Sequence, residues 1–170
     1  MSIEEALYLA LDAHRGQVDL DGKPYILHPL RVGLRGQNDK EIIAGLLHDV
    51  IEDTKYTLQD IADKGAERDV VEALSLLTHK KNQPYSEYLD RIIDSDNPIA
   101  IAVKKNDLLD NLARNDKATE AKQRIYEKHS RAIERLRADK KRKTKDERRK
   151  TKDERRKTKD EKRKTKSTQI

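Results

Sequence analysis

The sequence predicts an all-α protein of about seven or eight helices, followed by a basic C-terminal extension. Apolar residues in the first 138 positions recur at intervals of three and four, the spacing of one helix face. Runs of alternating polarity are hard to find, and the one candidate strand, 99–103, lies inside a longer helical pattern. The chain has no Trp and no Phe, so its core depends on aliphatic side chains, which suits packed helices.

The predicted helices can be placed in order along the chain. Ser2 and Glu5 form a capping box that starts the first helix, and Gly16 ends it. Residues 17–27 contain a glycine and a proline and are expected to form a loop. The remaining helices are expected at 29–35, from Asp39 to about Ile51, and at 57–62, 66–77, 84–93 and 97–113.

Charge divides the 170-residue chain into two parts. Residues 140–170 hold 17 Lys or Arg and 6 Asp or Glu, a net charge of +11, whereas residues 1–139 hold 21 and 26, a net charge of −5. The basic part repeats RKTKDER every seven residues from Arg142 without an apolar seam, so no coiled coil follows. We expect a folded domain over 1–138 and a solvated tail, partly helical or disordered, over 139–170. The tail either binds nucleic acid or another polyanion in a salt-dependent way, or is an appendage without a selected role.

Several classes of protein are excluded by composition. No run approaches 18 apolar residues, so no membrane span is expected. The acidic N-terminus does not read as a signal peptide, and the absence of Cys excludes disulfides, thiolate metal sites and a cysteine nucleophile. A cytoplasmic protein is the expectation, and the oligomeric state is left open.

The helix that ends near residue 53 places four polar side chains on one arc. His48, Asp49, Glu52 and Asp53 lie on this arc, opposite an apolar arc. The carboxylates crowd the C-terminal end of the helix, where the helix dipole disfavours negative charge. The arc is either a solvated acidic face or a site for a divalent cation.

Two further residues favour the cation site. His28 stands at the head of a predicted helix, and Asp107 lies within the helix 97–113. Together with His48 and Asp49 they supply two imidazoles and two carboxylates, a set that suits Mn²⁺ or a similar divalent ion with open positions. Such an ion activates water for attack on phosphorus.

Other side chains near these residues are candidates for catalysis and substrate binding. Glu52 and Asp53 could orient the water or carry its proton. Tyr25 either stacks on a base or packs under its loop, and Asn111 either contacts the nucleoside or caps. Four cations are candidate ligands of phosphate oxygens, or else are simply solvated: Lys23, Arg31, Lys104 and Arg114.

Four strings of the sequence resemble a known family. They are AHRGQVDLDGKPYILHPLRV (13–32), GLLHDVIEDT (45–54), Leu-Thr (77–78) and VKKNDLLDNLAR (103–114). In this order they are similar to the HD-domain phosphohydrolases related to the hydrolase domain of the RelA/SpoT stringent-response enzymes, above all to small single-domain members of bacteria and phages.

The resemblance implies an HD-type helical bundle with Mn²⁺ held by His28, His48, Asp49 and Asp107. It also implies that Glu52 and Asp53 assist hydrolysis, and that the reaction removes the 3′-pyrophosphate of guanosine tetra- or pentaphosphate.

The chain departs from the family pattern at two places. The family usually has Arg-Lys before the Gly-x-Pro-Tyr segment, where this chain has acidic residues at 19 and 21, which would repel a polyphosphate. The usual Arg-Leu-His-Asn is Leu-Leu-Asp-Asn at 108–111. Two alternatives therefore remain: a nucleotidase or phosphatase acting on another nucleotide, or an impaired HD scaffold with a polyanion-binding tail.

Overall fold

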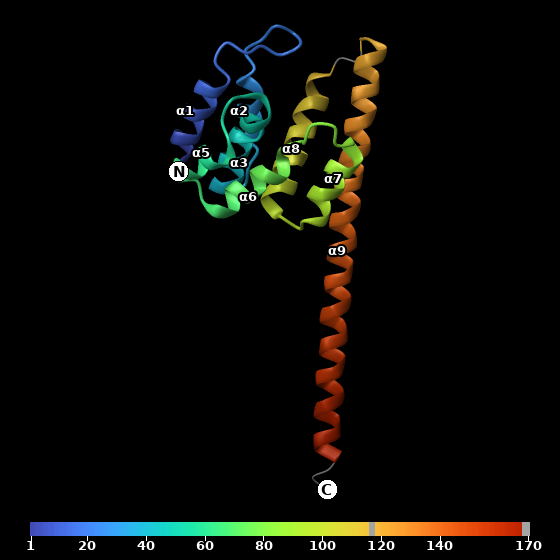
Figure 1. The fold of residues 1–170 in the computed structure, drawn as a ribbon. Coiled ribbons are helices and arrows are strands. Elements are labelled where there is room, and N and C mark those ends of the chain that lie inside the picture. The colour runs from blue at the N-terminus through green and yellow to red at the C-terminus, as the bar shows by residue number, and fades with distance from the viewer. Residues whose placement is uncertain (116–117, 168–170) are drawn as a thin grey trace. The chain divides into compact units, whose positions relative to one another are not determined.

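A computed structural model describes residues 1–115 and 118–167, and these are helical apart from loops and one isolated β-bridge, between Val18 and Pro24. The predicted all-α class is confirmed (Figure 1). None of the helices in this described part is both long and apolar enough to cross a membrane. The helices are α1 (Ile3–Ala13), α2 (Leu27–Gly33), α3 (Asp39–Leu47), α4 (Val50–Asp53), α5 (Leu58–Asp63), α6 (Arg68–Leu77), α7 (Tyr85–Asp94), α8 (Pro98–Arg114) and α9 (Glu120–Ser167).

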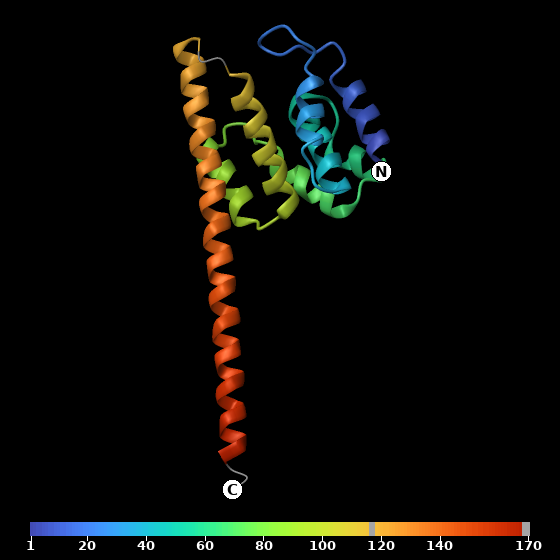
Figure 2. The ribbon, with the colours of Figure 1, turned by 180° about the vertical axis from the view of Figure 1, so that it is seen from behind.

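Contacts divide the chain into two units, 1–133 and 134–170. The first unit contains α1 to α8 and the start of α9. The second contains the remainder of α9, which continues as one helix to Ser167 (Figure 2).

Polar caps set the beginnings of several helices. The capping box predicted at α1 is present, because Ser2 Oγ accepts from Glu5 N while the Glu5 carboxylate accepts from Ser2 N. Asn38 and Asn97 cap α3 and α8 in the same manner, each accepting from the backbone N–H three residues on. Thr57 caps α5, so this helix begins one residue later than the sequence predicted.

The helix predicted from Asp39 to about Ile51 is divided into α3 and α4. The interruption falls at His48 and Asp49, whose backbones stay in the right-handed helical region. The carbonyl of Gly45 would accept from Asp49 N in a continuous helix, but here it accepts from Nδ1 of His48 at 2.8 Å. The side chain of His48 thus takes over a backbone acceptor at the point where the helix is interrupted.

Helix α3 is the centre of the first unit and packs against α1, α2, α6 and α8. These helices enclose a core of aliphatic side chains, as the composition predicts. Its fully buried members include Val32, Leu47, Val50, Leu74, Ile92 and Val103.

Two glycines allow α2 and α3 to approach closely. A Cβ added at Gly45 would lie 2.8 Å from the Cα of Gly33, and one at Gly33 would lie 2.9 Å from Cγ of Leu46. Because His28 lies on α2 and His48 directly follows α3, this approach determines the separation of the two imidazoles, whose ring centroids are 5.2 Å apart.

Replacing Gly45 by valine is therefore expected to destabilise the fold and the site together. The added side chain meets backbone atoms of α2, so the helices must separate, at a cost of about 2–3 kcal/mol. Urea unfolding of Gly45→Val measures this cost. Glu72→Val, on the exposed face of α6, controls for the helix propensity of valine. Equal unfolding midpoints for the two variants would contradict the close approach.

Candidate metal centre

Four side chains from three segments of the chain place ligand atoms near one another. Nε2 of His48 lies 3.0 Å from Asp49 Oδ2, and Nε2 of His28 lies 3.6 Å from the same oxygen. Oδ1 of Asp107 lies 3.4 Å from Nε2 of His28. Both histidines and Asp107 are buried, and Asp49 is partly exposed. The structure therefore brings together the four residues that the sequence nominated as metal ligands.

The two imidazoles are oriented by hydrogen bonds on their other nitrogens. Nδ1 of His28 donates to Asp110 Oδ2 at 2.8 Å, and Nδ1 of His48 donates to the carbonyl of Gly45. Each Nε2 is left to face carboxylate oxygens, and within the described residues that of His48 has no hydrogen bond of ordinary geometry. Imidazoles oriented in this way by a carboxylate or a carbonyl are typical of metal ligands. Ligand atoms of His28, His48 and Asp49 lie within 4.8 Å of one another and form a group that fits a divalent cation, and Asp107 lies beside this group at His28.

In the metal-free chain, protons compensate part of this negative charge. Burial lowers the pKa of His48, but the carboxylates of Asp49 and Asp107 and the hydrogen bond to Gly45 together outweigh burial and raise that pKa to about 9. Burial raises the pKa of Asp49, but the His48 imidazolium outweighs it and lowers that pKa to about 2. A metal ion must therefore displace a proton from His48 at neutral pH.

The stabilisation gained from metal is expected to grow with pH. The raised pKa of His48 stabilises the metal-free fold below the usual value of 6.5, and this stability is lost as pH rises through about 9. The difference in melting temperature between Mn²⁺-loaded and EDTA-treated protein should consequently widen from pH 6.5 to 9. Thermal scans across this range measure it. A difference that stays constant or narrows would contradict the exchange of a proton for the metal.

The two aspartates are held by neighbouring donors. Asp107 accepts from Nζ of Lys104 at 2.8 Å and from the side-chain amide of Asn111. The Tyr25 hydroxyl donates to Asp49 Oδ2 at 2.6 Å. Lys104, Asn111 and Tyr25, which the sequence nominated for substrate binding, thus contact the proposed metal ligands directly.

Asp110 connects the site to three arginines. It is 1% exposed, and besides His28 it accepts from Nε of Arg31 at 2.8 Å, from Arg35 at 3.2 Å and from Nε of Arg114 at 2.9 Å. Burial raises the pKa of Asp110, but His28 and Arg31 outweigh it and hold that pKa far below the usual range. The ionised carboxylate joins α2 to α8, which carry His28 and Asp107.

A cleft of about 520 Å³ opens over the four ligand residues. Glu52 and Asp53 line it, and the backbone N–H of His79 donates to Glu52 at 2.9 Å. Burial in the cleft raises the pKa of both carboxyls, helped by the charge of Asp49. A carboxyl with a raised pKa is suited to proton transfer near neutral pH.

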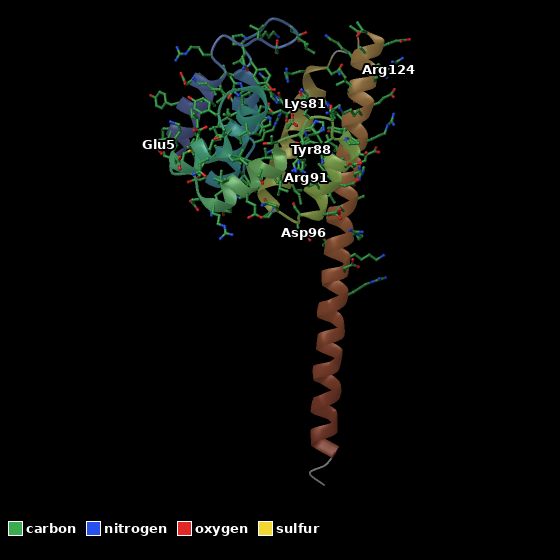
Figure 3. All side chains as sticks on the ribbon, in the orientation of Figure 1. Glu5, Lys81, Tyr88, Arg91, Asp96 and Arg124 are labelled. Atoms are coloured by element: carbon green, nitrogen blue, oxygen red, sulfur yellow. The ribbon has the colours of Figure 1, made fainter. Side chains whose placement is uncertain are left out.

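The cleft is also lined by two aromatic residues of α7 and a cation of α9 that sequence reasoning missed. Tyr88, labelled in Figure 3, and Tyr85 lie on α7, with Nζ of Lys104 4.9 and 5.7 Å from their ring centroids. Lys128 of α9 lies 3.8 Å from the Tyr85 centroid. Partial burial and the charge of Lys104 lower the pKa of Lys128. Among the described Lys and Arg residues lining the cleft, Lys128 alone makes no ion pair.

The remaining candidates lie at or outside the edge of the cleft. Arg114 lines it and is paired with both Asp19 and Asp110. Lys23 is exposed and does not line the cleft, and Arg31 is held by Asp110 instead. The structure therefore does not bring Lys23 to the other substrate-binding candidates.

Comparisons with known proteins agree with this fold and site. No protein-family model matches the chain. A guanosine-3′,5′-bis(diphosphate) 3′-pyrophosphohydrolase of Aquifex aeolicus is 33% identical over 119 residues, covering 65% of this chain and 17% of the relative. A probable enzyme of the same name from Mycoplasma genitalium is 31% identical over 147 residues, covering 75% and 20%. The chain thus spans a fifth or less of these relatives.

A solved structure is similar over most of both chains. It is described as a metazoan ortholog of SpoT that hydrolyzes ppGpp and plays a role in starvation responses. Its TM-score is 0.65 at 25% identity, and the match covers 79% of this chain and 85% of that one. The all-α bundle, with His28, His48 and Asp49 close together and Asp107 beside His28, matches an HD-type domain. More specifically, the chain is similar to the RelA/SpoT hydrolase-like HD domains, which confirms the resemblance stated from sequence.

Proposed function

We propose that this protein is a Mn²⁺-dependent phosphohydrolase that removes the 3′-pyrophosphate of guanosine tetra- or pentaphosphate. The observation that carries the proposal is the close group of His28, His48 and Asp49, with Asp107 beside His28, beneath an open cleft. The reaction named for the relatives and for the structural neighbour supports the choice of substrate.

The four convergent residues hold the divalent cation in this proposal. Such a cation supplies Lewis-acid activation of water and of the phosphate. Two imidazoles and two carboxylates match Mn²⁺, which accepts nitrogen and oxygen ligands.

Glu52 and Asp53 manage the protons of the reaction. Both line the cleft beside Asp49, and their raised pKa values let them take a proton from the attacking water and return it to the leaving group. The Tyr25 hydroxyl donates to Asp49 Oδ2 at 2.6 Å and lies 3.3 Å from Asp53 Oδ2, so it links one proton carrier to a metal ligand.

In this proposal, cations that line the cleft bind the substrate phosphates. Among the residues that the structure describes, Lys128 has no ion-pair partner, and it lines the cleft, while Arg114 exchanges contacts with carboxylates for contacts with phosphate. Lys104 remains with Asp107, and Asn111 stays beside the same carboxylate. Lys23 lies outside the cleft, so in this proposal it contributes only its positive charge to the electrostatic potential.

A substrate panel tests the proposal. Purified protein with Mn²⁺ is expected to release pyrophosphate from guanosine tetraphosphate, measured by coupling to pyrophosphatase, and to lose this activity in EDTA. Release of orthophosphate from simple 5′- or 3′-nucleotides would instead assign the protein the substrates of a nucleotidase. No release from any nucleotide in the panel would overturn the enzymatic proposal.

A second candidate function concerns residues 139–170, which we propose to be a polyanion-binding tail beside the HD domain of 1–138. The net charge of +11 over 140–170 supports it. The tail has no aromatic residue to stack on bases, so its binding is expected to be independent of sequence. Deletion of 140–170 is expected to abolish salt-sensitive binding of duplex DNA and leave hydrolysis unchanged. DNA binding that survives the deletion would contradict the assignment.

A further inference from the structure

The loop between α1 and α2 carries two carboxylates that contact cations of the cleft. Asp19 Oδ2 lies 3.4 Å from Nη1 of Arg114, and Asp21 Oδ1 lies 3.5 Å from Nζ of Lys122. All four residues line the cleft above the candidate metal centre. Cations suited to phosphate are therefore already in contact with carboxylates that belong to the chain itself.

Hydrogen bonds hold the loop in this position. Asp19 Oδ1 accepts from the backbone N–H of Asp21 at 3.0 Å and of Lys23 at 2.9 Å, and Asp19 N donates to the Lys23 carbonyl. Gly22 allows the turn, since its φ is +75°. Leu20 at the tip is 91% exposed, so this residue gives the tip no apolar anchor. Polar contacts and the two ion pairs thus position the loop.

Because the floor of the cleft is negatively charged, these two ion pairs matter for the binding of phosphate. The floor already carries the carboxylates of Asp49, Glu52, Asp53 and Asp107. A polyphosphate that enters must be neutralised by cations that line the cleft, and two of these, Arg114 and Lys122, are paired with Asp19 and Asp21. The pairs are partly solvated, so each is weak enough for a phosphate to displace it.

We propose that Asp19 and Asp21 form an acidic latch, which competes with substrate phosphates for Arg114 and Lys122. The latch lowers the affinity of the cleft for polyphosphates and favours ligands that carry fewer phosphate charges. This inference rests on the proposed function for its substrate, although its electrostatic part can be measured without turnover.

The double variant Asp19→Asn/Asp21→Asn tests the latch. Asparagine keeps the Oδ1 acceptor that organises the turn and removes only the charge. The KM for guanosine tetraphosphate is expected to fall at least about fivefold with kcat unchanged, and the difference should shrink in 0.5 M KCl. A gain of affinity cannot arise from misfolding, which makes the result specific.

A matched control and a binding measurement complete the test. Asp63→Asn/Asp94→Asn removes the same charge from exposed positions outside the cleft and should leave KM unchanged. Titration calorimetry with GDP in Mn²⁺-free buffer should show tighter binding to the latch variant only. If the wild type hydrolyses nothing, the proposed function fails while GDP binding still decides the latch. Unchanged or weaker binding, or an equal gain in the control, would overturn the inference.

Discussion

Replacing His48 by alanine is expected to abolish metal-dependent hydrolysis, with a loss of at least about 10³-fold in kcat. The imidazole is buried, its Nδ1 is committed to the Gly45 carbonyl, and its Nε2 faces Asp49 at 3.0 Å. The imidazole of His28 already faces Asp49 from α2 and so is not free to replace His48. The variant should also lose stoichiometric Mn²⁺, which calorimetry measures independently of activity.

His129 offers a matched control for this variant. Its imidazole is also partly buried, and burial lowers its pKa to about 4, but it is not among the residues that line the cleft. His129→Ala should therefore retain both Mn²⁺ and hydrolysis. If His48→Ala bound Mn²⁺ with wild-type affinity, the four convergent residues would not be the metal site.

The fold could be predicted from local patterns because its helices are marked by caps and apolar spacing. Ser2 and Asn97 mark helix starts in the sequence as clearly as in the structure. The division between α3 and α4 could not be predicted, since it depends on a side-chain contact from His48 to a backbone carbonyl. Periodicity continues through that point, because both residues of the interruption keep helical backbone angles.

From the sequence, only those residues of the site could be predicted that residue chemistry or the family resemblance indicates. His28 and Asp107 were nominated as ligands, yet their approach to 3.4 Å depends on the packing of α2 against α8. Asp110 was noted only as a departure from the family pattern, and nothing local shows that it contacts His28. Lys128 lies beyond every string that carries the resemblance, so only the fold reveals that it lines the cleft.

Replacing Asp110 by leucine is expected to damage both stability and metal binding. The change removes the acceptor of His28 Nδ1 and the shared partner of Arg31, Arg35 and Arg114. These arginine side chains are between 29% and 40% exposed, so water recovers part of the loss, and we expect a cost of about 2–3 kcal/mol. Without an oriented His28, the affinity for Mn²⁺ should fall about 10- to 100-fold.

Comparison with asparagine separates the two roles of Asp110. Asp110→Asn keeps an oxygen that can accept from His28 but loses the charge that balances the arginines. It should therefore lose stability while keeping Mn²⁺ affinity closer to wild type than Asp110→Leu does. Asp94→Leu, at an exposed position of α7, controls for the loss of a carboxylate elsewhere. Urea unfolding and Mn²⁺ calorimetry measure the two effects, and wild-type Mn²⁺ affinity in Asp110→Leu would show that His28 is oriented without this carboxylate.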